Sequence, residues 1–319
     1  MKTGSTGGCA ALSAKQIRRA CRRRDLRRCW QLYLYDFCRP LRQVFIFHYI
    51  PIYGVQIAFK DFRTSLGIWG SEWVGLKHFK RFLQYPDFWR IFWNTLRISL
   101  YGFATFPCSL IFALLLNELD NQKFKKTVQM ITYAPHFIST VVVCSMLMLF
   151  FDRSNGIVNN VIAALGGERY SFLTDPKCFD HLYTWSGVWQ GLGWGTIIYL
   201  AALSSISPEL IEAARIDGAT RFKIVWHINI PSILPTVITL LILRVGSLVG
   251  VGFEKIFLLQ NDLNMNVSRV ISTYTYEIGL KGGQFSYSSA IGLFNNIINI
   301  VLILIVNKIS KVVTDVALW

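Results

Sequence analysis

Hydrophobic residues along the chain gather into long runs that are separated by short polar segments. A helix needs about 20 mostly apolar residues to cross the hydrocarbon core of a bilayer. The ten-residue alternation of a membrane barrel is absent from the sequence, so the spans should be helices that satisfy their own backbone hydrogen bonds. The pattern therefore predicts an all-α membrane protein, with clear spans at residues 96–116, 128–151, 182–203, 233–253 and 290–306.

A further span, the first in chain order, is predicted at residues 44–59. This run is short, and extending it toward the N-terminus brings in Asp36, Arg39 and Arg42. Arginine side chains at the entry of a span can reach back to the interface. We therefore expect about six transmembrane helices in one membrane domain over 44–319, preceded by a tail and entry segment over 1–43.

The polar break at residues 204–231 carries signals for two short helices. Ser207 suits an N-cap and Pro208 suits the first helical position. Gly218 is a natural stop, and Thr220 can cap a second helix that leads into the next span. The segment is thus predicted to form a helix, a tight turn and a helix at one face of the membrane.

Small residues mark one side of the first of these helices. Leu210, Ala213 and Ala214 fall together at helical spacing, and the two alanines allow a partner to approach closely. Two interpretations remain open from geometry alone. The segment is either a docking surface or an ordinary amphipathic connector that packs against its own bundle.

Composition and charge add little about a substrate. The chain has 319 residues, 53% of them hydrophobic, and a formal net charge of +15. Much of this charge lies in the tail, which lacks the interleaved aromatic residues of a nucleic-acid site and directly precedes a span. We predict a lipid-surface and topology role and no nucleic-acid partner for its arginines, which are Arg18, Arg19, Arg22, Arg23, Arg24, Arg27 and Arg28.

The distribution of basic residues predicts the orientation in the membrane. With the N-terminus inside, the cytoplasmic segments hold 17 Lys and Arg residues and the opposite segments hold 12. The excess favours cytoplasmic N- and C-termini in a multi-pass protein of the bacterial plasma membrane.

Catalytic and cofactor signatures are not found in the sequence. The seven cysteines and five histidines are dispersed, without the paired spacing of a metal site, and no Walker-type phosphate loop occurs. We therefore predict no catalytic residue, no metal and no cofactor on this chain. If ATP drives its function, the hydrolysis must take place on another subunit.

The spacing of Glu212-Ala213-Ala214, then Gly218, then Ile228 and Pro231 resembles the EAA loop of ABC importer permeases. Ile230 stands before Pro231, where leucine is more usual. Other strings resemble the LplB-like, polysaccharide-transporter branch of the carbohydrate-importer permeases. They include YIPIYG at 49–54, ALLLNE at 113–118, YAPHFIS at 133–139, GFEK at 252–255 and the C-terminal Leu318-Trp319, so the resemblance covers about residues 44–319.

The resemblance implies a type I, MetI-like bundle that imports oligosaccharides or polysaccharide-derived sugars. Its implied partners are a second homologous permease, an ABC ATPase dimer that binds ATP and magnesium, an extracytoplasmic solute-binding lipoprotein and the lipid bilayer. Coupling to the ATPase would be carried by Glu212, Ala213, Ala214 and Gly218. The competing hypothesis is a stand-alone secondary transporter or channel for a small polar solute, which leaves the 212–231 segment unexplained.

Three residues are candidates for the substrate path. Arg244 lies near the middle of the 233–253 run, where an ionisable group faces a bundle interior or a wet cavity. It would bind sugar, or it would be a structural partner for a carbonyl or an acidic group of the second permease. Trp189 and Tyr199 could stack on sugar rings, and helix packing or interface anchoring explains them equally well.

Overall fold

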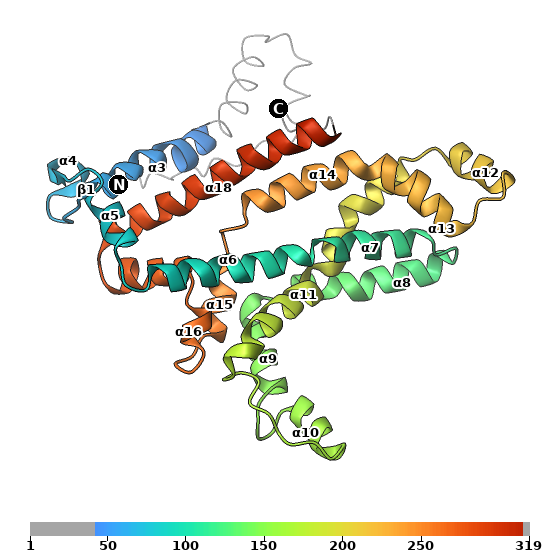
Figure 1. Ribbon diagram of the computed structural model, residues 1–319, viewed down its shortest axis with the longest axis horizontal. Coiled ribbons are helices and arrows are strands. Elements are labelled where there is room, and N and C mark those ends of the chain that lie inside the picture. The colour runs from blue at the N-terminus through green and yellow to red at the C-terminus, as the bar shows by residue number, and fades with distance from the viewer. Residues whose placement is uncertain (1–41, 315–319) are drawn as a thin grey trace, which may run out of the picture.

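The computed structural model describes residues 42–314, and these form a helical bundle elongated along one axis (Figure 1). Most long helices run roughly along this axis, while α9 and α10 project sideways from it. The arginine-rich tail, the entry to the first span and Leu318-Trp319 lie outside the described residues. The predictions made for them, and the division of the chain at residue 43, remain predictions.

The first described segment is helical, as the 44–59 run predicts, but it changes helix type along its length. It comprises η1 (Phe45–Tyr49), α3 (Ile50–Ile52) and η2 (Tyr53–Phe59), which are π, α and 3-10 in turn. Pro51 stands at the start of α3, where its missing N–H disturbs the regular hydrogen-bond pattern. The segment is not among the described helices long enough to span a membrane.

A small two-stranded sheet and a short helix follow at one end of the bundle (Figure 1). The elements are β1 (Lys60–Asp61), α4 (Gly67–Gly70), β2 (Glu72–Trp73) and α5 (Lys77–Leu83), and the strands pair antiparallel with Lys60 opposite Trp73. Burial lowers the pKa of His78, so its ring is neutral at neutral pH. Its Nε2 lies 3.2 Å from the Lys60 carbonyl oxygen, which can only accept, so Nε2 carries the proton.

Three helical segments are long and apolar enough to cross a membrane without a sharp bend. The first, Phe88–Asn117, joins α6 (Phe88–Ala104) and α7 (Phe106–Asn117); the second, Arg221–Gly246, ends with α14 (Ile230–Gly246); the third, Phe285–Val312, lies in α18 (Phe285–Thr314). The helices predicted at 96–116 and 290–306 are therefore confirmed and are longer than the apolar runs. Pro107 lies in the first turn of α7, and the α6–α7 junction falls at Thr105, just before this helix.

The run predicted to span the membrane at 128–151 is helical but sharply bent. This run divides into α8 (Gln122–Tyr133), η3 (Ala134–Phe137) and α9 (Thr140–Phe150), with a bend of 98°. Pro135 cannot donate within the regular ladder, and the Ser139 hydroxyl accepts from the Val142 N–H at 3.4 Å and so starts a new helix. A short α10 (Ile157–Ala164) follows beyond α9.

The helix predicted at 182–203 is present as α11 (Pro176–Ser204), which meets the next helix at a bend of 74°. The span predicted at 233–253 is wrong at its end, because α14 stops at Gly246 and a turn precedes α15 (Phe253–Leu259). Glycines at 246, 250 and 252 lower the helix propensity of this stretch. Counting each bent pair as one span, the described residues hold up to five spans, so the predicted six are not reached among them.

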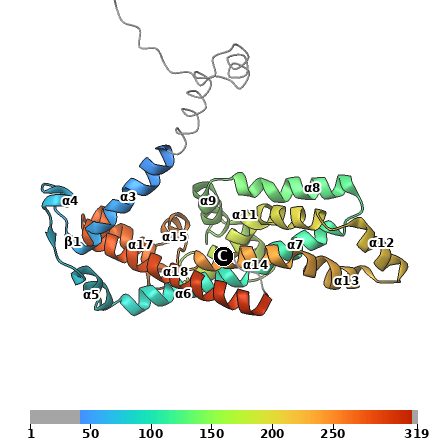
Figure 2. The same cartoon turned by 90° about the horizontal axis from the view of Figure 1, so that it is seen from above.

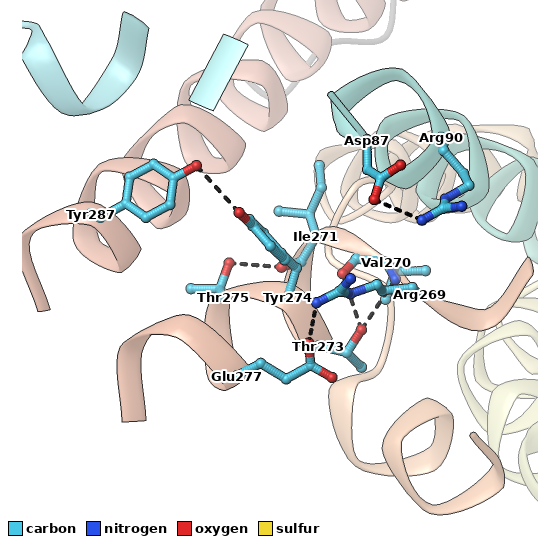
Figure 3. A network of polar contacts seen from close by, with 10 residues as sticks. All are labelled: Asp87, Arg90, Arg269, Val270, Ile271, Thr273, Tyr274, Thr275, Glu277 and Tyr287. Atoms are coloured by element: carbon cyan, nitrogen blue, oxygen red, sulfur yellow. Dashed lines mark hydrogen bonds and ion pairs between the residues drawn. The ribbon is translucent and has the colours of Figure 1, made fainter. Parts of the chain in front are cut away.

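The last elements before α18 are α16 (Met265–Ser268), α17 (Ile271–Tyr276) and η5 (Glu277–Lys281). Figure 3 shows the polar contacts around α17. The hydroxyl of Tyr274 lies 3.3 Å from that of Tyr287 on α18, and Arg269, just before α17, pairs with Glu277, just after it. Both tyrosines are buried in an aromatic cluster that also contains Phe82. This core packs α5 against α17 and the start of α18.

A close approach of α11 to α8 gives a test of the packing. A Cβ on Gly193 would lie 2.3 Å from the Thr132 carbonyl oxygen, whereas one on Gly187 would meet its nearest atom, the Lys255 Nζ, at 3.6 Å. We expect Gly193→Ala to destabilise the fold by about 1–3 kcal/mol, because α8 must move. The matched Gly187→Ala should be neutral or gain up to about 1 kcal/mol of helix propensity. Thermal unfolding in detergent measures both, and equal midpoints would contradict this packing.

Candidate functional site

The polar break forms the helix, turn and helix that its sequence predicts. α12 (Pro208–Ile216) begins after Ser207, although the Ser207 side chain makes no capping hydrogen bond. Gly218 adopts a φ of +77°, which side-chain-bearing residues rarely adopt, and the Ala219 N–H donates to the Ala214 carbonyl at 2.9 Å. The chain therefore turns sharply at Gly218, just after the end of α12.

The second helix of the break runs directly into a span. It consists of α13 (Arg221–Ile224) and the π-helical η4 (Val225–Asn229), which continues into α14. The Thr220 hydroxyl accepts from the Lys223 N–H at 3.4 Å and caps its start. A movement of α12 therefore acts on a helix that is continuous with the membrane bundle.

Polar contacts tie this segment to the connection between α7 and α8. Arg221 forms an ion pair with Asp120, with Nη2 and Oδ2 2.8 Å apart, and its Nη1 donates to the Glu118 carbonyl at 3.3 Å. Asn229 donates to the Glu118 carboxylate at 3.5 Å. The start of the α13–α14 helix is therefore fixed to the body of the bundle, while α12 extends beyond it.

α12 projects from the end of the molecule, opposite the β1–β2 sheet (Figures 1 and 2). None of its residues is buried, and Glu212, Ala213 and Gly218 are all exposed, with Ala214 half-buried. Large apolar side chains near them are exposed too, including Ile216 at 87% and Phe222 at 75%. The four residues predicted to couple this chain to a partner thus share one exposed tip that does not pack on its own bundle.

A cavity of about 630 Å³, partly open to the outside, lies between α6, α7, α11, α14 and α15. Arg244 and Tyr199, two of the three residues predicted for the substrate path, both line it. Arg244 is exposed in the last turn of α14, and it also lines an adjoining cavity of about 160 Å³. Tyr199 is buried, with 3% of its surface exposed.

Trp189 does not line this cavity. It is 48% exposed and borders a separate apolar hollow between α9 and α11, together with Trp185 and Phe150. The structure therefore brings together Arg244 and Tyr199 and places Trp189 elsewhere.

Sequence reasoning missed several residues of the cavity wall. Lys255 lines it with 9% of its surface exposed, and the Oγ1 of Thr184 is buried there without a hydrogen-bond partner among the described residues. Four glycines, at positions 102, 187, 191 and 195, also line it. Lys255 directly follows an apolar run, in a position typical of a loop charge, so nothing local marks it as part of the cavity wall.

Apolar helices around a partly open cavity, with an exposed helix–turn–helix at one end, are typical of a membrane transport subunit. Comparison with known proteins makes this specific. The chain belongs to the family of binding-protein-dependent transport system inner membrane components, whose pattern matches residues 105–314. This is a family of inner-membrane transport permeases and not a family of enzymes.

Two similar proteins come from Bacillus subtilis (strain 168). It is 46% identical to Protein LplB over 267 residues, covering 83% of this chain and 84% of that protein. It is 43% identical to the polygalacturonan/rhamnogalacturonan transport system permease protein YteP over 283 residues, covering 88% of each. The predicted resemblance to the LplB-like branch is confirmed.

A solved structure confirms the fold. The chain matches a bacterial ABC transporter involved in the import of the acidic polysaccharide alginate, with a TM-score of 0.83 and 37% identity, covering 93% of this chain and 99% of that one. The same transporter has been solved in complex with an alginate pentasaccharide-bound periplasmic protein. The predicted ABC importer permease fold is therefore the fold of this chain.

Proposed function

We propose that this chain is one of two permease subunits of an ATP-driven importer for oligosaccharides or polysaccharide-derived sugars. The observation that carries the proposal is the exposed tip formed by Glu212, Ala213, Ala214 and Gly218, on a helix that nothing in its own bundle covers. The sugar substrate is supported by the similarity to YteP, a permease of a polygalacturonan/rhamnogalacturonan transport system, and to the alginate transporter.

In this proposal α12 docks on a separate ABC ATPase dimer, which binds ATP and magnesium. Ala213 and Ala214 let the ATPase surface approach closely, Glu212 makes a polar or ionic contact, and Gly218 supplies the backbone geometry of the turn. Closure of the ATPase dimer pulls the coupling helices of the two permeases together. Because α13 continues into α14, the pull rotates the bundle as a rigid body between two packed states.

The remaining partners occupy the other faces of the chain. A second, homologous permease completes the translocation path, and an extracytoplasmic solute-binding lipoprotein delivers the sugar. The periplasmic protein seen with the alginate transporter supports this arrangement. With α12 on the cytoplasmic side, the β1–β2 end faces outward, and both termini lie in the cytoplasm as the basic residues predict.

The cavity bordered by Arg244 and Tyr199 is the proposed sugar path through this subunit. Its volume falls within the range of about 300–1,000 Å³ that is usual for small-ligand sites. Trp189 lies outside the cavity, and packing explains it without a role in the path.

Co-purification from native membranes tests the proposal. The chain is solubilised gently, affinity-purified and its partners are identified by mass spectrometry. We expect a second permease and an ABC ATPase in stoichiometric amounts. A chain that comes out alone, under detergents that preserve other ABC importers, would favour the stand-alone transporter instead.

A further inference from the structure

The break between α14 and α15 relies on side chains of other helices to satisfy its backbone. It covers residues 247–252, and Val249 within it is buried, with 6% of its surface exposed. The Val249 N–H donates to the Oδ1 of Asn299, on α18, at 3.2 Å. A buried backbone N–H in a membrane protein needs such a partner, because no water is present to replace it. Asn299 therefore fixes the height at which the end of α14 stands against α18.

A second asparagine lies one turn away on the same side of α18. Asn295 precedes Asn299 by four residues, which is about 6 Å along a helix, so the two side chains stand one above the other. The Oδ1 of Asn295 is buried and has no hydrogen-bond partner among residues 42–314. A buried acceptor without a partner is costly and calls for an explanation. This side of α18 thus offers two acceptors of the same kind, one paired and one unpaired.

The contact between α14 and α18 suits a shift of one helix along the other. The two helices pack side by side, and Gly246, at the end of α14, lies so close to Ile303 of α18 that a Cβ there would clash with its side chain. A glycine at such a crossing removes a ridge that would otherwise lock the register. Because the ridges and grooves of a helix repeat with every turn, a shift of one turn restores the packing.

We propose that Asn299 and Asn295 are positioning residues that hold α14 at two heights along α18, one turn apart. In the state of this structure the Val249 N–H pairs with Asn299. In the second state α14 stands one turn nearer the β1–β2 end, and the same N–H pairs with Asn295. Packed elements are known to move past one another by one turn in this way.

The inference rests on the proposed function and adds an internal step to the rocking movement. The pull on α12 passes through α13 to α14, which changes its hydrogen-bond partner on α18 while the rest of the bundle rotates. The alternative is that both asparagines have only a structural role in the packing of α18.

The test uses the complete importer, with its second permease, ATPase and binding protein, in proteoliposomes and with the native cysteines of this chain replaced. Spin labels at Ser232, near the start of α14, and Ile309, near the end of α18, report the height of α14, and both positions are exposed. The label distance is measured without nucleotide and with ATP trapped by vanadate. Because α14 and α18 run in opposite directions, the proposed shift shortens this distance by up to about 5 Å.

Two variants remove one acceptor each. Asn299→Leu removes the acceptor of the present state and Asn295→Leu that of the second state, so they should shift the two populations in opposite directions. We expect each shift to be about fivefold or more, and sugar uptake to fall in both variants. Asn295→Leu should not lower the thermal midpoint, because its Oδ1 has no partner in this structure. The matched control is Asn296→Leu, the same change at an exposed neighbour, which should leave populations and uptake unchanged.

A single label distance in all conditions, or a shift in the same direction in both variants, would overturn the inference in favour of the structural role. If Asn299→Leu does not insert, Asn295→Leu decides alone, and unchanged populations with normal uptake would overturn the inference. Sugar uptake and ATP hydrolysis that proceed with a single label distance would leave the proposed function standing. An importer that neither takes up sugar nor hydrolyses ATP would overturn both.

Discussion

Replacing Gly218 with valine is expected to reduce sugar uptake to background while the chain still inserts into the membrane. Gly218 has a φ of +77°, and a β-branched residue there is strained by about 1–2 kcal/mol. The turn must therefore open, which displaces α12 from the contact that we propose with the ATPase. Uptake of labelled sugar and stimulated ATP hydrolysis should fall together.

Gly166→Val is the matched control for this variant. Gly166 also has a positive φ, +84°, and a Cβ at either glycine would meet no atom within 4 Å. The same substitution therefore introduces the same kind of strain, but in the turn after α10, away from α12 (Figure 1). Uptake should survive in Gly166→Val. Normal uptake by a properly inserted Gly218→Val chain would refute the coupling assignment.

The apolar runs of the sequence predicted where helices exist, because burial in lipid demands long hydrophobic segments whatever their neighbours are. Their ends were harder to predict. The bend before α9 is caused by Pro135 and by the Ser139 cap, which lie within an apolar run. A mean hydropathy over the run does not register these two residues, so it did not predict the bend. The early end of α14 at Gly246 was hidden in the same way, because the glycines at 246, 250 and 252 lie within an apolar run.

The exposed tip could be predicted because its signals are local. A capping position, Pro208 and Gly218 lie within a dozen residues and fix α12 by themselves. The cavity could not be predicted in this way, because its wall comes from five helices that are far apart in the sequence. Lys255 shows the difference: its neighbours in the sequence suggest a loop charge, and only the tertiary packing buries it.

A bulky residue at Gly191 is expected to block the path without disturbing the coupling tip. Gly191 lies on α11 in the cavity wall, and a Cβ there would meet no atom within 4 Å. A phenylalanine side chain can therefore enter the open space rather than push helices apart. We expect Gly191→Phe to reduce sugar uptake to background while the loaded binding protein still stimulates ATP hydrolysis, because α12 is unchanged.

Two controls separate obstruction from misfolding. Gly191→Ala adds only a methyl group and should keep most of the uptake, and Gly292→Phe adds the same ring at an equally open position of α18, outside the cavity wall. Retained uptake in Gly191→Phe would show that sugar does not pass through this cavity. Loss of stimulated ATP hydrolysis would show instead that the ring disturbs the bundle itself. Gly218→Val should lose both sugar uptake and stimulated ATP hydrolysis, because the coupling to the ATPase is broken. Gly191→Phe should lose uptake alone, because a closed path leaves ATP hydrolysis responsive to the loaded binding protein. The two variants together therefore distinguish a closed path from a broken coupling.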